Sequence, residues 1–180
     1  MRVLIGVCGG IAAYKSAEVV SKLVQAGCEV DVSMTPQAER FITALTFSAL
    51  TGRATQTLEQ LSQDSLGQTY AHLYPATEVD VFALVPATAN TIGSIANGLG
   101  TEPVSNGALS LRENCKRIYC PAMNTHMWKQ PAVQRNCKQL KEDGWIAIGP
   151  ESGRLACGSL GMGRLADTDI IIEKILQQKG

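Results

Sequence analysis

The sequence is poor in metal-binding groups and carries no excess of charge of either sign. Its six cysteines form no Cys-x-x-Cys pair and only two histidines are present, so we expect no metal site. Lysine plus arginine and aspartate plus glutamate each number 16, and the formal net charge is zero. Nothing in this composition indicates a basic surface that would attract nucleic acids or anionic membranes, so we expect the protein to bind neither of them.

Long apolar stretches are also missing. No run reaches the 18 apolar residues typical of a membrane-spanning helix. The apolar start, Val3 to Val7, has no basic segment before it and no small-residue cleavage site after it, as a secretion signal would have. We therefore expect a cytoplasmic protein with reduced thiols.

What the sequence does contain is an alternation of strand-like apolar runs with helical segments. The expected strands are 2–7, 28–34, 79–85, 117–120 and 145–148, and the second of them is expected to be half-exposed. Of the expected helices, the first ends at residue 26, the second begins at 35–36, and the others span 88–97, 131–143 and 167–178. This order predicts an α/β fold: a doubly wound, mostly parallel sheet with helices on both faces, flavodoxin-like or Rossmann-like, in a single domain spanning residues 1–180.

Two stretches fit no regular element. Arg53 to Tyr70 is polar, with four glutamines, and Pro150 to Gly163 contains four glycines. Long connections without regular structure are uncommon in compact domains and are often functional. We expect both to be active-site loops.

Chemistry in such a fold is expected where the parallel strands end. After the first strand, Gly9 and Gly10 precede a helical segment, which suits an anion as well as a simple turn; the pattern is neither G-x-G-x-x-G nor a P-loop. After the second strand, Thr35 stands where a nicotinamide site would have an acidic residue. Its hydroxyl suits a phosphate or a flavin, or a helix cap.

The third and fourth strands are followed by polar loops. Pro86-Ala-Thr-Ala-Asn-Thr91 offers hydroxyls and an amide that match the rim of a flat heterocycle or cap a helix. In Pro121-Ala-Met-Asn-Thr-His-Met-Trp128, the amide of Asn124 suits a substrate carboxylate or a turn. Cys157 differs from the other cysteines by its glycine-rich, Arg154-flanked setting, and a neighbouring cation lowers a thiol pKa.

Taken together, these motifs resemble the homo-oligomeric flavin-containing cysteine decarboxylase family, over about residues 3 to 171. The resemblance implies bound FMN. Its flavin contacts fall on Gly9, Gly10, Ile11, Thr35, Thr88, Ala89, Asn90, Thr91 and Ala122; its substrate contacts fall on Asn124, Arg154, Leu155 and Ala156; its proton acceptor falls on His72 and its proton donor on Cys157.

One departure concerns His72, which is followed closely by Pro75. A proline is tolerated in the first helical turn but not deeper, so we expect a helix to start near Pro75 and His72 to lie in the loop before it. His126 matches no functional residue of the family, and we expect no role for it.

The resemblance is strongest to family members that act in coenzyme A biosynthesis. It implies decarboxylation of 4'-phospho-N-pantothenoyl-L-cysteine to 4'-phosphopantetheine through thioaldehyde and ene-thiolate intermediates, in a homo-oligomer (a trimer or a multiple of three). The 180 residues leave no room for a C-terminal ligase domain, so the ligase is expected to be a separate protein.

Two other functions stay open. Relatives that decarboxylate the C-terminal cysteine of a peptide share the Pro-x-Met-Asn motif but lack the reducing cysteine, so Cys157 favours the pantothenoyl substrate. A non-catalytic FMN-binding regulatory protein is the second alternative, and the joint presence of His72, Asn124 and Cys157 argues against it. Flavin prenyltransferases of similar fold lack the Pro121–Asn124 stretch.

Overall fold

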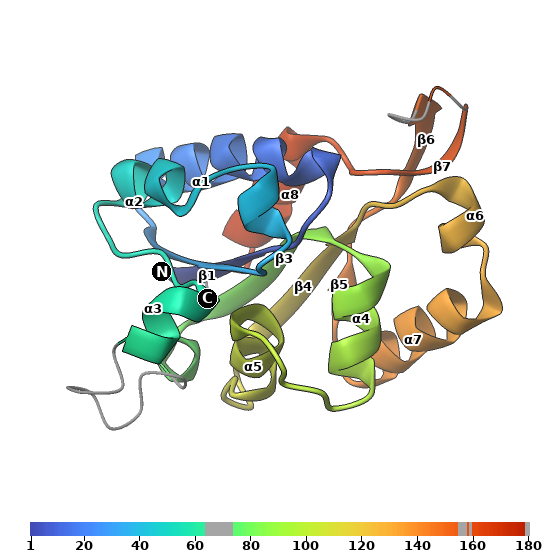
Figure 1. Ribbon diagram of the computed structural model, residues 1–180. Helices are drawn as coiled ribbons and strands as arrows, with labels where there is room; N and C mark the ends of the chain where they lie inside the picture. Colours follow the sequence, from blue (N-terminus) through green and yellow to red (C-terminus); the bar gives the residue numbers. More distant parts are fainter. Residues whose placement is uncertain (64–73, 155–157, 159, 179–180) are drawn as a thin grey trace.

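The fold is built around one parallel sheet (Figure 1). The computed structural model describes residues 1–63, 74–154, 158 and 160–178. Five strands pair in the order β2-β1-β3-β4-β5, all parallel. They are β1 (Arg2–Val7), β2 (Glu29–Met34), β3 (Val81–Ala87), β4 (Lys116–Pro121) and β5 (Ile146–Ala147). The strand order reverses beside β1, which is the flavodoxin-like topology and confirms the predicted fold class.

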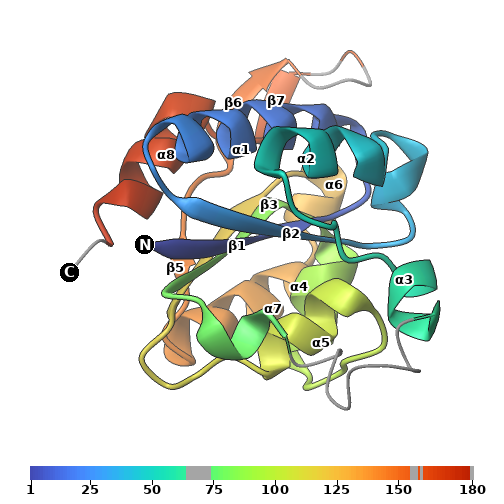
Figure 2. The same cartoon turned by 90° about the vertical axis from the view of Figure 1, so that its left-hand side faces the viewer.

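Helices cover both faces of the sheet, as Figure 2 shows. One face carries α1, α2 and α8, and the other carries α4, α5 and α7. The helices, in chain order, are α1 (Lys15–Gln25), α2 (Ala44–Thr51), α3 (Leu58–Gln63), α4 (Ala89–Ala96), α5 (Pro103–Leu109), α6 (Thr125–Trp128), α7 (Pro131–Glu142) and α8 (Thr168–Leu176), with 3-10 helices at Ile11–Tyr14, Ala38–Arg40 and Ala76–Glu78.

The alternation of side chains along the strands divides the core into two layers. In β1, Val3 and Ile5 pack with α1 and α8, whereas Leu4 joins Phe82 and Leu140 in the layer under α4, α5 and α7. Successive strand residues point to opposite faces, so one apolar run fills both layers. Among the described residues, no helix is long and apolar enough to cross a membrane.

The predicted half-exposure of the second strand is wrong. Residues 30–34 of β2 are all buried, although β2 lies at the edge of the sheet. The segment after α2 covers this edge, where Gln56 bridges Ser33. Asp31 is buried because two guanidiniums neutralise it: Nε of Arg2 lies 3.0 Å and Nε of Arg53 2.7 Å from its carboxylate oxygens.

Helix starts were predicted with mixed success. The expected start at Thr35-Pro36 gives only a turn and the 3-10 helix Ala38–Arg40, and the α-helix α2 begins at Ala44. Near Pro75 the chain does enter a helical turn, the 3-10 helix Ala76–Glu78. Strand β3 begins two residues later than expected, whereas α4, α7 and α8 lie where the sequence predicts them.

The expectation of two loops without regular structure is also wrong. The stretch from Pro150 to Gly163 contains β6 (Glu151–Arg154) and β7 (Leu160–Arg164), which pair antiparallel as a hairpin. These strands are rich in glycine and have no β-branched residues, so their sequence carries little strand signal. The stretch from Arg53 to Tyr70 contains the Gln56 bridge and α3, and its residues 64–70 lie outside the described part of the chain.

Candidate active site

A cavity of about 760 Å³ lies at the carboxyl ends of β1, β3 and β4. Ligands of doubly wound sheets bind at this edge, close to the point where the strand order reverses. The volume is typical of a small-molecule or cofactor site. The lining residues are Gly9, Gly10, Ile11, Ala12, Tyr14, Lys15, Thr35, Gln37, Pro86, Thr88, Ala89, Asn90, Thr91, Glu102, Ala122, Met123, Asn124, Met127, Arg154, Gly163, Arg164 and Leu165.

The structure therefore brings together every predicted site residue that it describes. All nine residues predicted to contact the flavin line this cavity, together with Asn124 and Arg154. His72, Leu155, Ala156 and Cys157 lie outside the described residues. The roles of all these residues stay predictions, because proximity to a cavity does not assign a role.

The turn after β1 uses its two glycines differently. A Cβ on Gly9 would lie 2.6 Å from the backbone carbonyl carbon of Gln37, so only glycine lets this turn approach the turn after β2. A Cβ on Gly10 would meet no atom within 4 Å. Gly10 therefore leaves a bare stretch of backbone beside the cavity, followed by the start of a helical segment whose N–H groups suit an anion.

The sequence left two roles open for Thr35, a contact with a phosphate or flavin and a local contact at the start of a helix. Its hydroxyl oxygen accepts a hydrogen bond from the backbone N–H of Ala38 at 3.1 Å, which fixes the turn before the 3-10 helix Ala38–Arg40, whose N-cap is Gln37. The residue is buried and lines the cavity.

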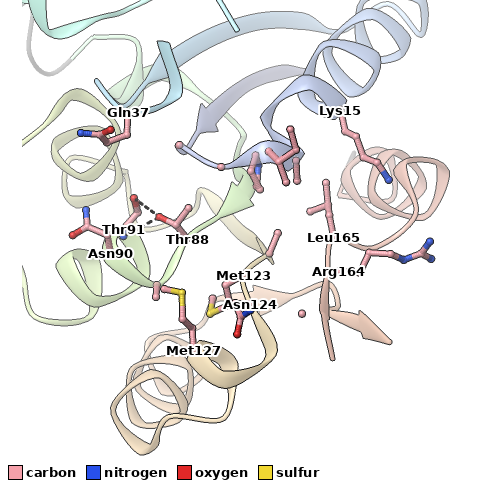
Figure 3. A pocket seen from close by; sticks show the side chains of 18 of the residues that line it. Lys15, Gln37, Thr88, Asn90, Thr91, Met123, Asn124, Met127, Arg164 and Leu165 are labelled. Atoms are coloured by element: carbon pink, nitrogen blue, oxygen red, sulfur yellow. Dashed lines mark hydrogen bonds between the residues drawn. The ribbon is translucent and has the colours of Figure 1, made fainter. Parts of the chain in front are cut away.

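The start of α4 forms a small hydroxyl network, drawn with dashed lines in Figure 3. Thr88 is the N-cap and accepts from the N–H of Thr91 at 3.5 Å, and the two hydroxyls lie 3.4 Å apart. The Thr91 hydroxyl donates to the carboxylate of Glu102 at 3.4 Å. Burial raises the pKa of Glu102, with the Thr91 hydrogen bond opposing that shift.

Asn124 ends the loop after β4 and caps α6. Its side-chain oxygen accepts from the backbone N–H of His126 at 2.8 Å. This bond orients the amide group, since its oxygen is occupied as an acceptor and its nitrogen is a donor only. His126 is exposed and is not among the residues that line the cavity.

The hairpin of β6 and β7 forms the remaining wall of the cavity, beside α6 (Figure 1). The backbone N–H of Met123 donates to the carbonyl of Gly163 at 2.9 Å. Gly163 has a φ of +136°, and a Cβ there would lie 2.1 Å from the carbonyl oxygen of Met123. Glycine is therefore required at this position for two reasons: the positive φ and the close approach of the Met123 backbone.

Four of the six cysteines have the character of buried core residues. Cys8, Cys115, Cys120 and Cys137 are buried, and burial raises the pKa of each thiol. For Cys8 the pKa rises to about 12, although hydrogen bonds to Thr91 and Thr88 lower it in part. Such thiols remain protonated and unreactive near neutral pH.

Several lining residues were not anticipated as site residues. Gln37, Glu102 and Met127 reach the cavity from turns and helix ends, and Lys15 and Arg164 each end a glycine-containing motif. Glu102 is the N-cap of α5, and its backbone N–H donates to the hydroxyl of Ser105 at 3.4 Å. The sequence carries no signal for it, because Glu-Pro-Val-Ser reverses the Ser-x-x-Glu order of a capping box. The other four residues line the cavity only because the loops that carry them meet in the folded chain, which the sequence pattern does not indicate.

The chain matches the sequence pattern of one protein family, the flavoproteins, over residues 1–180. It belongs to the flavoprotein family. Members of this family bind FMN, and the chain is placed among its cysteine decarboxylases by the relatives described next.

Two relatives show how the similarity is distributed. A protein of Streptococcus mutans named probable phosphopantothenoylcysteine decarboxylase is 39% identical over 98% of both chains. A coenzyme A biosynthesis bifunctional protein of Bacillus subtilis is 41% identical over 95% of this chain, and the match spans 41% of that longer protein.

Two solved structures share the fold closely. A PPC decarboxylase mutant complexed with pantothenoylaminoethenethiol has a TM-score of 0.90 at 28% identity, covering 98% of this chain and 96% of that one. The FMN-dependent cysteine decarboxylase SpaF has a TM-score of 0.83 at 31% identity, covering 100% of this chain and 98% of the other.

The contact between the hairpin and the loop after β4 is testable by substitution. We expect Gly163→Ala to destabilise the protein by about 3 kcal/mol or more, because it adds a clash with Met123 to the strain of a positive φ. Gly144→Ala is the matched control: Gly144 has a φ of +85° with no atom near its Cβ position, so only the strain of about 1 kcal/mol applies. Urea unfolding measures both, and equal losses would contradict the contact.

Proposed function

We propose that this protein is an FMN-dependent decarboxylase of 4'-phosphopantothenoylcysteine, which yields 4'-phosphopantetheine. The observation that carries the proposal is the convergence of the glycine turn after β1, the hydroxyls at the start of α4 and the amide of Asn124 on one cavity. These three features come from separate strands and match, in order, the residues expected to hold a flavin and a substrate carboxylate.

The described residues fit FMN. Gly10 leaves open space where any other residue would place a Cβ, and the lining combines apolar groups such as Ile11 and Ala122 with the hydroxyls and amide of residues 88–91. A flat aromatic ring system with polar edges requires this mixture. When bound, FMN supplies an electron sink that lets an otherwise unactivated β-thiol carboxylate lose CO₂.

The chain's own residues position the substrate and handle its protons. Asn124 is proposed to bind the carboxylate that leaves, with its amide orientation set by the cap on α6. Met123 and Met127 line the cavity beside Asn124 with apolar side chains (Figure 3). His72 is proposed to accept a proton from the substrate and Cys157 to return one to the ene-thiolate after CO₂ has left; both lie outside the described residues.

Two lines of support favour the pantothenoyl substrate over a peptide. The relative of Streptococcus mutans named for this activity is 39% identical over 98% of both chains, and the coenzyme A biosynthesis protein of Bacillus subtilis is 41% identical over 95% of this chain. The sequence also retains Cys157 within Ala156-Cys157-Gly158, and reduction of an ene-thiol to a saturated thiol needs such a donor. The relative crystallised with pantothenoylaminoethenethiol is itself a mutant, and its ligand is an ene-thiol.

Product analysis tests the proposal. Supplied with 4'-phosphopantothenoylcysteine, the FMN-loaded protein is expected to release CO₂ and form 4'-phosphopantetheine, with no activity toward a peptide that ends in cysteine. Cys157→Ser is expected to release CO₂ while the ene-thiol accumulates, detected by mass spectrometry as a product two mass units lighter. A yellow protein without turnover would support a binding protein instead, and full formation of 4'-phosphopantetheine by the variant would remove Cys157 from its role.

Asn124→Asp tests the carboxylate site without removing the cap, because aspartate caps helices as well as asparagine does. We expect kcat/KM to fall at least about 100-fold, since a second carboxylate repels the substrate carboxylate. FMN content, read from visible absorbance, is expected to stay unchanged. Asn114→Asp, in an exposed turn before β4, serves as the control. Equal activity of the two variants would exclude this role.

We also propose that the protein is a homo-oligomer, a trimer or a multiple of three. Large apolar side chains are exposed near the cavity: Ile11 and Tyr14 on one side and Leu160 and Met162 on the hairpin. Exposed apolar groups that gather near a site are typical of an interface. Sedimentation equilibrium is expected to give a mass of at least three chains, and the mass of one chain would overturn this proposal.

A further inference from the structure

The cavity is lined by more basic than acidic residues, and two of the basic ones, Lys15 and Arg164, have no role in the proposed binding of FMN or of the substrate carboxylate. Of the described lining residues, Lys15, Arg154 and Arg164 are basic and Glu102 is acidic. Figure 3 shows Lys15 and Arg164 on one side of the cavity, across from Thr88, Asn90 and Thr91. The two sides therefore differ in character: one is cationic, and the other presents neutral hydroxyl and amide groups.

The carboxylate of Glu151 forms an ion pair with Arg164 and is also influenced, more weakly, by the charge of Lys15. A nitrogen of the Arg164 guanidinium lies 2.6 Å from a carboxylate oxygen of Glu151. The Arg164 hydrogen bond, the backbone N–H of Asp167 and, more weakly, the charge of Lys15 lower the pKa of Glu151. Both cations thus lie near one another, although they are 149 positions apart in the sequence (164 − 15). One carboxylate cannot neutralise both.

Lys15 is not used as a structural ion pair. Among the described residues it has no acidic partner within 4.0 Å, whereas Lys22 on the same helix lies 3.0 Å from Glu18 and 2.7 Å from Asp169. Of the two lysines of α1, the one at the cavity is therefore the one that forms no ion pair with a described residue. A phosphate monoester, which carries nearly two negative charges at neutral pH, is the kind of group that such a pair of cations binds.

We propose that Lys15 and Arg164 bind the phosphate of the substrate and so select a phosphorylated cysteine derivative over an uncharged or peptide one. This inference rests on the proposed decarboxylase function and names the substrate-selecting residues within it. Charge-assisted hydrogen bonds to a phosphate are stronger than those to neutral groups, so the loss of one cation lowers affinity for the phosphorylated form alone.

The position of Arg164 argues for the substrate phosphate rather than the phosphate of FMN. Arg164 belongs to β7, in the hairpin that also carries Arg154, which is predicted to line the substrate. The predicted flavin contacts lie instead on the turns after β1, β2 and β3 and, with Ala122, directly after β4. The glycine turn after β1 and the start of the helical segment that follows it provide backbone N–H donors that suit the cofactor phosphate.

The test uses Lys15→Gln, because this change breaks no ion pair among the described residues. With the FMN-loaded protein, kcat/KM is measured for pantothenoylcysteine with and without its phosphate. Wild type is expected to prefer the phosphorylated form, and Lys15→Gln to lose roughly 10- to 100-fold on that form only. Lys116→Gln is the matched control, since Lys116 is an exposed lysine at the amino end of β4, on the opposite edge of the sheet.

Two further measurements separate the possible failures. The dissociation constant of FMN, followed by quenching of flavin fluorescence, is expected to be the same in wild type and Lys15→Gln. A weaker FMN complex with equal losses on both substrates would assign Lys15 to the cofactor phosphate and overturn the inference, as would a wild type that shows no preference for the phosphorylated form.

Calorimetry with 4'-phosphopantothenate and pantothenate keeps the inference testable without turnover. If wild type releases no CO₂, the proposed function fails. The subsite is then still supported by tighter binding of the phosphorylated compound that Lys15→Gln abolishes, and it is overturned if the two compounds bind wild type equally.

Discussion

The parallel hydrogen-bonded pairing of β1 with β3 and of β3 with β4 is the constraint on which the site depends. Parallel strands in register end at the same edge, so the loops after them must meet there. These loops present polar groups, namely the bare backbone at Gly10, the hydroxyl of Thr88 and the amide of Asn124, which would be costly to bury inside either core layer. The sheet thus gathers into one cavity the groups that the chain separates by more than a hundred positions.

Capping interactions then hold these loops in place and also limit what their side chains can do. Thr35, Thr88 and Asn124 each accept a hydrogen bond from a backbone N–H at the start of a helical turn. The two interpretations offered for such residues, cap and ligand contact, are therefore not exclusive. A capped side chain has a fixed orientation and loses little entropy when a ligand binds, which favours recognition by a preorganised site.

Charge is distributed unevenly around the cavity although the whole chain is neutral. Glu102 stands beside the hydroxyls at the start of α4, where burial favours its protonated form. The cations Lys15 and Arg164 lie across the cavity from Thr88 and Thr91 (Figure 3). The electrostatic field in the cavity therefore attracts an anion toward Lys15 and Arg164, which a count of charged residues over the sequence cannot reveal.

The sequence by itself determined the layer architecture, the mostly parallel sheet and the residues at the strand ends, because apolar periodicity and turn residues are local signals. It did not reveal the hairpin of β6 and β7, whose glycine-rich strands have low strand propensity and are held by pairing with each other and by the Met123–Gly163 hydrogen bond. Nor did it reveal that β2 is buried, because Asp31 reads as a surface residue until Arg2 and Arg53 neutralise it. The meeting of Lys15 with Arg164 likewise depends on contacts between residues remote in sequence. Only the tertiary structure decided these points, since pairing partners and electrostatic neighbours are properties of the folded chain and not of any local segment.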